Sequence, residues 1–320
     1  MASFMQKALQ YLGLKDIDND GFYDDEDLDA YFSARGRETP HVERIWVGSR
    51  LPDPQSAPAE DRIGITAVLQ VLGSVAPGAD LAVYFAENNE MGLSDGLSRA
   101  VHDEERANAV ILLTASVAED EASPMMAQVL GDVARTAAAM GRVICVPVSA
   151  DSPNLPAREP YALACAATKA TAKAGAFFEW PGTLPAVGSG TYERAQWQDD
   201  AIVDRSAAPA GQSLVPDVCA LGGPYGFVID GRWASLSDDL LAAALWAGLL
   251  ARIQGAVRHP WGTVPDLYQQ YAPAGALVPV PHTLEPVQQG WRPAIGLGAP
   301  DGDRLLTTCR TAANEPGAVR

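Results

Sequence analysis

The most constraining feature of the sequence is a set of short apolar segments between residues 63 and 148, each bounded by helical patterns or turns. They are residues 81–85 (Leu-Ala-Val-Tyr-Phe), 109–113 and 143–146. Apolar runs of this length without polar alternation are typical of strands buried on both faces, and the helical stretches between them favour parallel pairing. The alternation therefore predicts a doubly wound α/β sheet.

Other segments have clear local patterns. Residues 227–231 (Phe-Val-Ile-Asp-Gly) predict a strand that runs into a turn, and residues 238–254 carry apolar side chains in i, i+4 rows, which predicts a buried helix. Residues 50–62 hold three prolines and few apolar side chains, so a surface loop is expected there. Residues 173–214 are rich in Gly, Pro, Ser and Thr and predict loops or small strands.

The N-terminal region predicts a helix, an acidic loop and a second helix over residues 1–35, packed on a main α/β domain over residues 36–320. Apolar side chains recur at helical spacing over residues 4–12, and Leu28, Tyr31 and Phe32 share one face of the second helix. Neither an internal repeat nor a linker-like tract interrupts the chain, which is therefore expected to be effectively one domain.

Charge and composition narrow the classes of partner. The net charge of −17 over 320 residues repels phosphate backbones and anionic lipid headgroups, so neither nucleic acid nor a membrane surface is an expected partner. The chain starts without a signal-peptide pattern, and uninterrupted apolar stretches fall short of the ~18 residues of a membrane span. We therefore expect a cytoplasmic protein. Its four widely spaced cysteines predict buried thiols rather than a zinc cluster or a disulfide framework.

Several strings resemble, in order and spacing, those of the sedolisins, the acid-acting serine-carboxyl peptidases. Residues 73–86, which include Ala76-Pro77-Gly78, are followed by Ala100-Val101-His102-Asp103. The other matching strings are Tyr23-Asp24-Asp25 and residues 160–165, 215–218, 228–231, 250–253, 290–291 and 296–300. The resemblance spans most of the chain and implies a subtilisin-like three-layer α/β/α sandwich with a mostly parallel central sheet.

Sedolisin chemistry uses a serine nucleophile, a glutamate general base, an aspartate that orients the base, and a second aspartate at the oxyanion site. Counting from the matching strings, the glutamate position falls on Gly64, its aspartate partner on Val68 and the nucleophile on Leu240. The oxyanion aspartate is replaced by Ala150 in an ungapped alignment or retained as Asp151 with one insertion. The resemblance therefore implies a pseudopeptidase.

Other departures from the family pattern agree with this interpretation. The Ser-Trp-Gly-Gly segment beside which the family holds its substrate becomes Thr114-Ala115-Ser116-Val117, which indicates a rebuilt cleft. Arg292 stands where the family's C-terminal calcium loop would have an aspartate, and a cation beside calcium is unfavourable. The chain also begins close to mature-domain sequence, so no propeptide is expected.

A second metal motif lies near the N-terminus. Residues 16–27 follow the spacing of an EF-hand or dockerin calcium loop, with Gly21 at the sharp turn. The predicted ligands are Asp16, Asp18, Asp20, the Phe22 carbonyl, Asp24 and Asp27. Clustered carboxylates repel one another without a cation, which favours calcium as the cofactor. A solvated acidic loop is the alternative.

Polar residues near the old catalytic positions are candidates for a ligand-binding cleft. These candidates are Ser116, Ser149, Asp151, Ser237 and Asp239. Ser237 followed by two aspartates at the start of an apolar helix is also the pattern of a helix N-cap, which is the favoured interpretation.

The sequence thus predicts a catalytically inactive, sedolisin-like binding, scaffold or regulatory protein whose partner is a peptide, a protein or a small ligand. One alternative is an enzyme with a repurposed, non-peptidase site in the old cleft. Another is a structural or assembly subunit, for which the acidic surface would suffice.

Overall fold

A computed structural model describes residues 23–48, 59–148, 154–173, 176–182, 191–202, 210–258, 260–280 and 290–313. The helix predicted over residues 4–12 lies outside them. The helices are α2 (Asp25–Ser33), α3 (Ala59–Val75), α4 (Glu90–Val101), α5 (Pro124–Ala139), α6 (Gln196–Asp200), α7 (Asp239–Val257), α8 (Val264–Asp266), the π-helix η2 (Leu267–Tyr271) and α9 (Gly302–Ala313). The strands are β1 (Val42–Trp46), β2 (Leu81–Phe85), β3 (Val110–Leu112), β4 (Val117–Ala118), β5 (Val143–Pro147), β6 (Asn154–Leu155), β7 (Ala162–Lys173), β8 (Ala176–Pro181), β9 (Val218–Leu221), β10 (Tyr225–Ile229), β11 (Arg232–Leu236), β12 (Leu277–Val278) and β13 (Ala299–Pro300).

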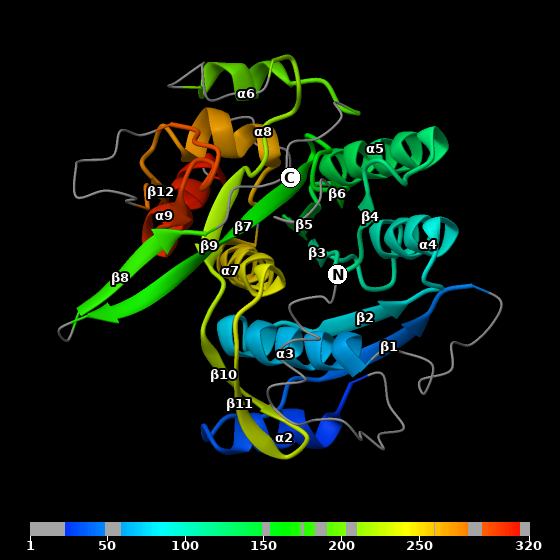
Figure 1. Cartoon of the computed structure of the whole chain (residues 1–320), viewed down its shortest axis with the longest axis vertical. Coiled ribbons are helices and arrows are strands. Elements are labelled where there is room, and N and C mark those ends of the chain that lie inside the picture. The colour runs from blue at the N-terminus through cyan, green and yellow to red at the C-terminus, as the bar shows by residue number, and fades with distance from the viewer. Residues whose placement is uncertain are drawn as a thin grey trace.

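A five-stranded, mostly parallel sheet forms the centre of the fold (Figure 1). β3 pairs with β5, β5 with β7, and β7 with β9, all in parallel. The distal half of β7 continues into an antiparallel hairpin with β8. This arrangement confirms the predicted α/β fold class.

Side chains alternate between the two faces of the sheet, as the period of a strand requires. On β5, Val143 and Cys145 belong to the apolar cluster formed with α7, η2 and α9. Their neighbours Ile144 and Val146 belong to the cluster formed with α4 and α5. Helices therefore cover both faces, which gives the three layers seen in Figure 1.

The strand predicted at residues 81–85 does not join this sheet as expected. It forms β2, which pairs in parallel with β1 as a two-stranded sheet of its own. The Tyr84 hydroxyl donates a hydrogen bond to Asp103 and accepts one from Asn108. These side-chain contacts connect β2 to the segment that leads into β3.

The predicted helix at residues 238–254 is α7, a largely buried helix. Among the described helices, α7 has the length and hydropathy of a membrane span, with a mean hydropathy of 1.6. It packs against β5, β7 and β9 on one side and α3 on another, and Trp246 and Leu250 are fully buried. The apolar side chains of α7 therefore pack in the protein core.

A β-hairpin connects the sheet to α7 and reaches α2 at its far end (Figure 1). β10 and β11 are joined by Asp230 and Gly231, which have φ of +50° and +69°. Two consecutive positive φ values are the signature of a type I′ turn, for which Asp-Gly is a preferred sequence. The buried amide of Gln70 in α3 exchanges two hydrogen bonds with the backbone of Val228 and holds the hairpin in place.

Two predicted loop regions contain regular structure. Residues 59–62, expected to be part of a surface loop, form the first turn of α3, because Glu60 and Asp61 suit the positive end of a helix. Residues 49–58 lie outside the described residues. Within residues 173–214, the described parts include β8 and the short helix α6.

Candidate functional site

The positions that the sedolisin resemblance assigns to catalysis lie where α3 meets α7. Gly64 and Val68 are buried in α3, one helical turn apart, and Leu240 is half-buried in the first turn of α7. Val68 and Leu240 belong to the same apolar cluster, which also contains Phe227 and Leu241. The structure therefore buries Val68 among apolar side chains and packs Leu240 against the same cluster.

The N-terminus of α7 is capped by Asp238 rather than by Ser237, which corrects the predicted cap by one residue. The Asp238 carboxylate accepts a hydrogen bond from the Leu240 amide at 2.8 Å, and the Asp238 amide donates to the Gly222 carbonyl. Burial raises the pKa of Asp238, and the Leu240 amide opposes that rise. Asp239 stands in the first turn, where its charge suits the positive end of the helix.

The remaining cleft candidates come from different segments. Ser116 is exposed on the segment between β3 and β4, and Ser237 and Asp239 are half-buried at the start of α7. Ser149, Ala150 and Asp151 lie outside the described residues. Ala150 and Asp151 therefore both remain alternatives for the residue at the oxyanion position.

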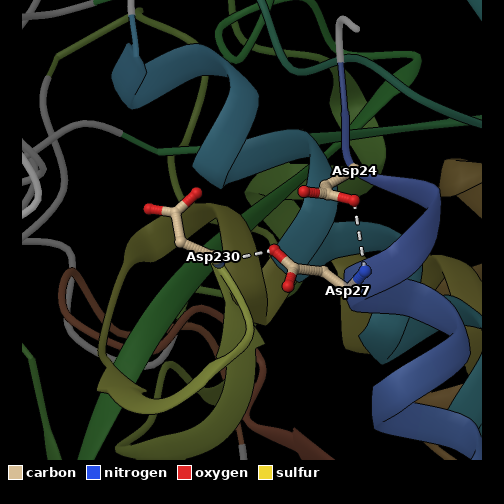
Figure 2. A group of neighbouring side chains, drawn as sticks. All are labelled: Asp24, Asp27 and Asp230. Atoms are coloured by element: carbon tan, nitrogen blue, oxygen red, sulfur yellow. Dashed lines mark hydrogen bonds between the residues drawn. The ribbon is translucent and has the colours of Figure 1, made fainter. Parts of the chain in front are cut away.

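Three carboxylates meet where α2 approaches the β10–β11 hairpin (Figure 2). Carboxylate oxygens of Asp24, Asp27 and Asp230 lie within 4.8 Å of one another. Asp24 is the N-cap of α2 and accepts hydrogen bonds from the amides of Glu26 and Asp27. We call these three residues the aspartate cluster.

Asp27 is the buried member of the aspartate cluster, with 2% of its surface exposed. Its two carboxylate oxygens accept hydrogen bonds from the amides of Asp230 and Gly231, both at 2.7 Å. Burial raises the pKa of Asp27 more than these amides lower it. The pKa of Asp230 is also raised by burial and by Asp24, while Arg62 and Arg232 oppose the shift.

The aspartate cluster contains two of the predicted calcium ligands, Asp24 and Asp27, together with Asp230, which the sequence analysis missed. The other predicted ligands, Asp16, Asp18, Asp20 and Phe22, lie outside the described residues. α2 begins at Asp25, directly after the ninth loop position, as the exiting helix of such a loop would. Calcium binding stays a prediction.

The C-terminal loop does not suit the calcium ion that the family resemblance implies. Described residues 290–298 contain no carboxylate, and the Arg292 backbone forms hydrogen bonds with Gly296 in both directions. The Trp291 indole donates to the Pro216 carbonyl, which packs the loop on the chain before β9. Backbone and indole contacts thus hold this loop.

A buried polar network that sequence analysis did not single out lies around Asp217, directly before β9. Its carboxylate accepts hydrogen bonds from the Ala164 amide and the Tyr268 hydroxyl, at 2.8 and 2.6 Å. Burial raises the pKa of Asp217 to about 7. Burial also raises the pKa of Glu159 to about 7, with a contribution from the charge of Asp217. The string at residues 215–218 marked this position only through the family resemblance.

The fold is similar to those of sedolisin-like and subtilisin-like proteases. The Pseudomonas sedolisin, a serine-carboxyl proteinase complexed with two molecules of pseudo-iodotyrostatin, superimposes with a TM-score of 0.74 at 22% identity, covering 90% of this chain and 89% of that chain. A lanthipeptide protease matches with a TM-score of 0.51 at 11% identity, covering 88% of this chain and 83% of that chain.

Sequence comparison points in the same direction. Kumamolisin from Bacillus sp. (strain MN-32) is 28% identical over 332 residues, which covers 93% of this chain and 60% of kumamolisin. The chain therefore spans about three fifths of that relative. No family model matches the sequence. The similarities to kumamolisin and to the Pseudomonas sedolisin support the predicted sedolisin resemblance.

Proposed function

We propose that the chain is a sedolisin-family protein that lacks the family's peptidase chemistry and acts by binding a peptide, a protein or a small ligand. The proposal rests on one observation. Val68 and Leu240, at the positions assigned to the orienting aspartate and the nucleophile, pack into a single apolar cluster. An uncompensated carboxylate at the buried position of Val68 would cost several kcal/mol, so the surroundings favour an apolar residue there over the orienting aspartate.

The absence of these groups removes both the nucleophile and the general base of the family mechanism. Hydrolysis by this mechanism needs a nucleophile and a base within hydrogen-bond reach of each other. Gly64, Val68 and Leu240 offer neither a hydroxyl nor a carboxylate. Transition-state stabilisation by groups that act as a unit is lost almost completely when one member is removed.

Binding would use the polar groups that remain around the N-terminus of α7 and the segment after β3. Ser116 is exposed, and Ser237 and Asp239 are partly accessible. The Pseudomonas sedolisin is named as a serine-carboxyl proteinase, which makes a peptide the first ligand class to test.

The test exposes the purified chain to a diverse peptide library between pH 3 and pH 8 and identifies cleaved and retained peptides by mass spectrometry. We expect retention without cleavage. The variants Ser116→Ala and Asp239→Asn should reduce retention, whereas Asp303→Asn, an exposed acid on α9, should leave it unchanged.

Reproducible cleavage would contradict the proposal. Cleavage that Asp151→Asn abolishes would mean that the oxyanion aspartate is retained and that the nucleophile lies elsewhere in the chain. Cleavage that survives this change would favour an enzyme with a repurposed site.

A further inference from the structure

We propose that the outward side of the junction between the N-terminal ends of α4 and α5 docks a cationic, amphipathic peptide segment of another protein. We call this surface the methionine face. We define it by the exposed residues at and just before these helix ends, which are Met91, Met125, Glu87, Asp95, Asp120 and Glu121. The inference goes beyond the proposed function, because it uses none of the cleft candidates.

The two helix ends are joined directly. The Glu90 carboxylate accepts hydrogen bonds from the Ser123 amide and the Ser123 hydroxyl, both at 2.7 Å. One turn later, the Ser94 hydroxyl contacts the Met126 sulfur at 3.0 Å. These contacts fix which sides of α4 and α5 face each other.

Helix geometry then places the two exposed methionines. Successive residues of a helix are 100° apart, so Met91 lies next to Glu90 and Ser94 but turned away from the buried Leu93 and Leu97. By the same geometry Met125 lies beside Met126, turned away from the core. Both side chains therefore border the outward side of the α4–α5 junction.

Their exposure is unusual for large apolar side chains. Met91 is 74% exposed and Met125 is 75% exposed, whereas Met126 between the helices is 3% exposed. Methionine is flexible and polarisable, and exposed methionines are common on surfaces that bind varied apolar side chains. This pair offers an adaptable anchor for an apolar residue of a partner.

The surrounding charge identifies the partner as cationic. Residues 86–98 and 113–134 contain seven acidic residues and no Lys or Arg. Glu119 is buried beside Arg158 and Glu90 is bonded to Ser123, which leaves five exposed acids: Glu87, Asp95, Asp120, Glu121 and Asp132. The next basic residues along the two helices, Arg99 and Arg135, form ion pairs with Asp103 and Asp132. An acidic rim around an apolar anchor selects basic amphipathic segments and repels phosphate backbones and anionic lipids.

The test titrates the full chain, labelled with [13C-methyl]methionine, with a 14-residue synthetic peptide of leucine and lysine in an amphipathic helical pattern. The sequence has six methionines, so each methyl signal can be assigned by substitution. We expect the signals of Met91 and Met125 to shift and that of the buried Met126 to change little. Fluorescence anisotropy with the labelled peptide gives the affinity, which should fall as salt is raised.

Two matched sets of changes test the surface. Met91→Ser/Met125→Ser should weaken binding at least about fivefold, while Met140→Ser, at the other end of α5, should not. Asp120→Asn/Glu121→Gln should also weaken binding, while Glu104→Gln/Asp303→Asn should not. A leucine–glutamate peptide and a serine–lysine peptide should bind weakly or not at all.

Equal binding of the leucine–glutamate peptide, or unchanged binding after Met91→Ser/Met125→Ser, would overturn the proposal. Loss of binding on Asp239→Asn but not on the methionine changes would place the peptide in the cleft and also overturn it. Failure of the library experiment above would leave this result standing, because the two tests use separate residues.

Discussion

The guanidinium of Arg158 lies 3.3 Å from the carboxylate of Glu119, and both side chains are almost fully buried. The antiparallel pairing of β4 with β6 brings the two residues together, since Glu119 follows β4 and Arg158 follows β6. Glu119 also accepts a hydrogen bond from the Thr191 amide at 2.9 Å. One buried carboxylate therefore joins three segments of the chain.

Removing one partner of this pair should be costly. Arg158→Met leaves the Glu119 charge buried without its cation, so we expect the free energy of unfolding to fall by about 3–5 kcal/mol. Urea unfolding monitored by tryptophan fluorescence measures the change. The double change Arg158→Met/Glu119→Leu removes both charges and should recover much of the loss. A double variant no more stable than Arg158→Met would show that the carboxylate matters through Thr191 instead.

Asp27 of the aspartate cluster can be compared with its neighbour Asp25 in the same turn of α2. Asp27→Ala leaves the amides of Asp230 and Gly231 without their acceptor, which should lower the free energy of unfolding by about 2–4 kcal/mol. Asp25→Ala removes a surface ion pair with Arg44 and should cost less than about 1 kcal/mol. Equal effects of the two changes in chemical denaturation would argue against an anchoring role for Asp27.

The buried acids Asp217 and Glu159 predict a pH dependence of stability. Burial raises the pKa of each to about 7, so between about pH 4 and 7 the folded chain holds protons that the unfolded chain releases. The free energy of unfolding should therefore decrease as pH rises from about 4 to 7 and level off above that range. Asp217→Asn should flatten this dependence, as measured by urea midpoints across the range. An equally steep dependence in that variant would rule out Asp217 as the source.

The calcium-loop prediction can be separated from the anchoring role of Asp27. Asp16→Asn/Asp18→Asn removes two predicted ligands without touching the contact between Asp27 and the hairpin. If the loop holds calcium, EDTA should lower the thermal unfolding midpoint of the natural chain and leave that of the variant unchanged. Identical midpoints of the natural chain with calcium and with EDTA would exclude the loop as a calcium site.

Local patterns predicted the elements that are buried on both sides or governed by turn chemistry. Residues 109–113 and 143–146 form adjacent parallel strands, and residues 238–254 form the core helix, because apolar periodicity reports burial directly. Asp230 and Gly231 end the predicted strand in a turn because few other residue pairs adopt two positive φ values.

Features that depend on distant partners were not predictable in this way. The strand at residues 81–85 pairs with β1, whose sequence Val-Glu-Arg-Ile-Trp shows no strong apolar run. Asp230 was missed as a neighbour of Asp24 and Asp27 because about 200 residues separate them in sequence. The Asp217 network likewise depends on Ala164 and Tyr268, which only the folded chain brings together.

The contact between Asp27 and the Asp230–Gly231 turn also bears on how the chain is made. The two ends of this contact are 203 and 204 residues apart, so α2 cannot acquire this partner until most of the protein has been synthesised. During translation α2 can pack early against α3 and β2, since Leu28 shares an apolar cluster with Leu69 and Phe85. Its contact with the hairpin can form only after β10 and β11 have been synthesised, so the earliest described helix gains its two hairpin hydrogen bonds late.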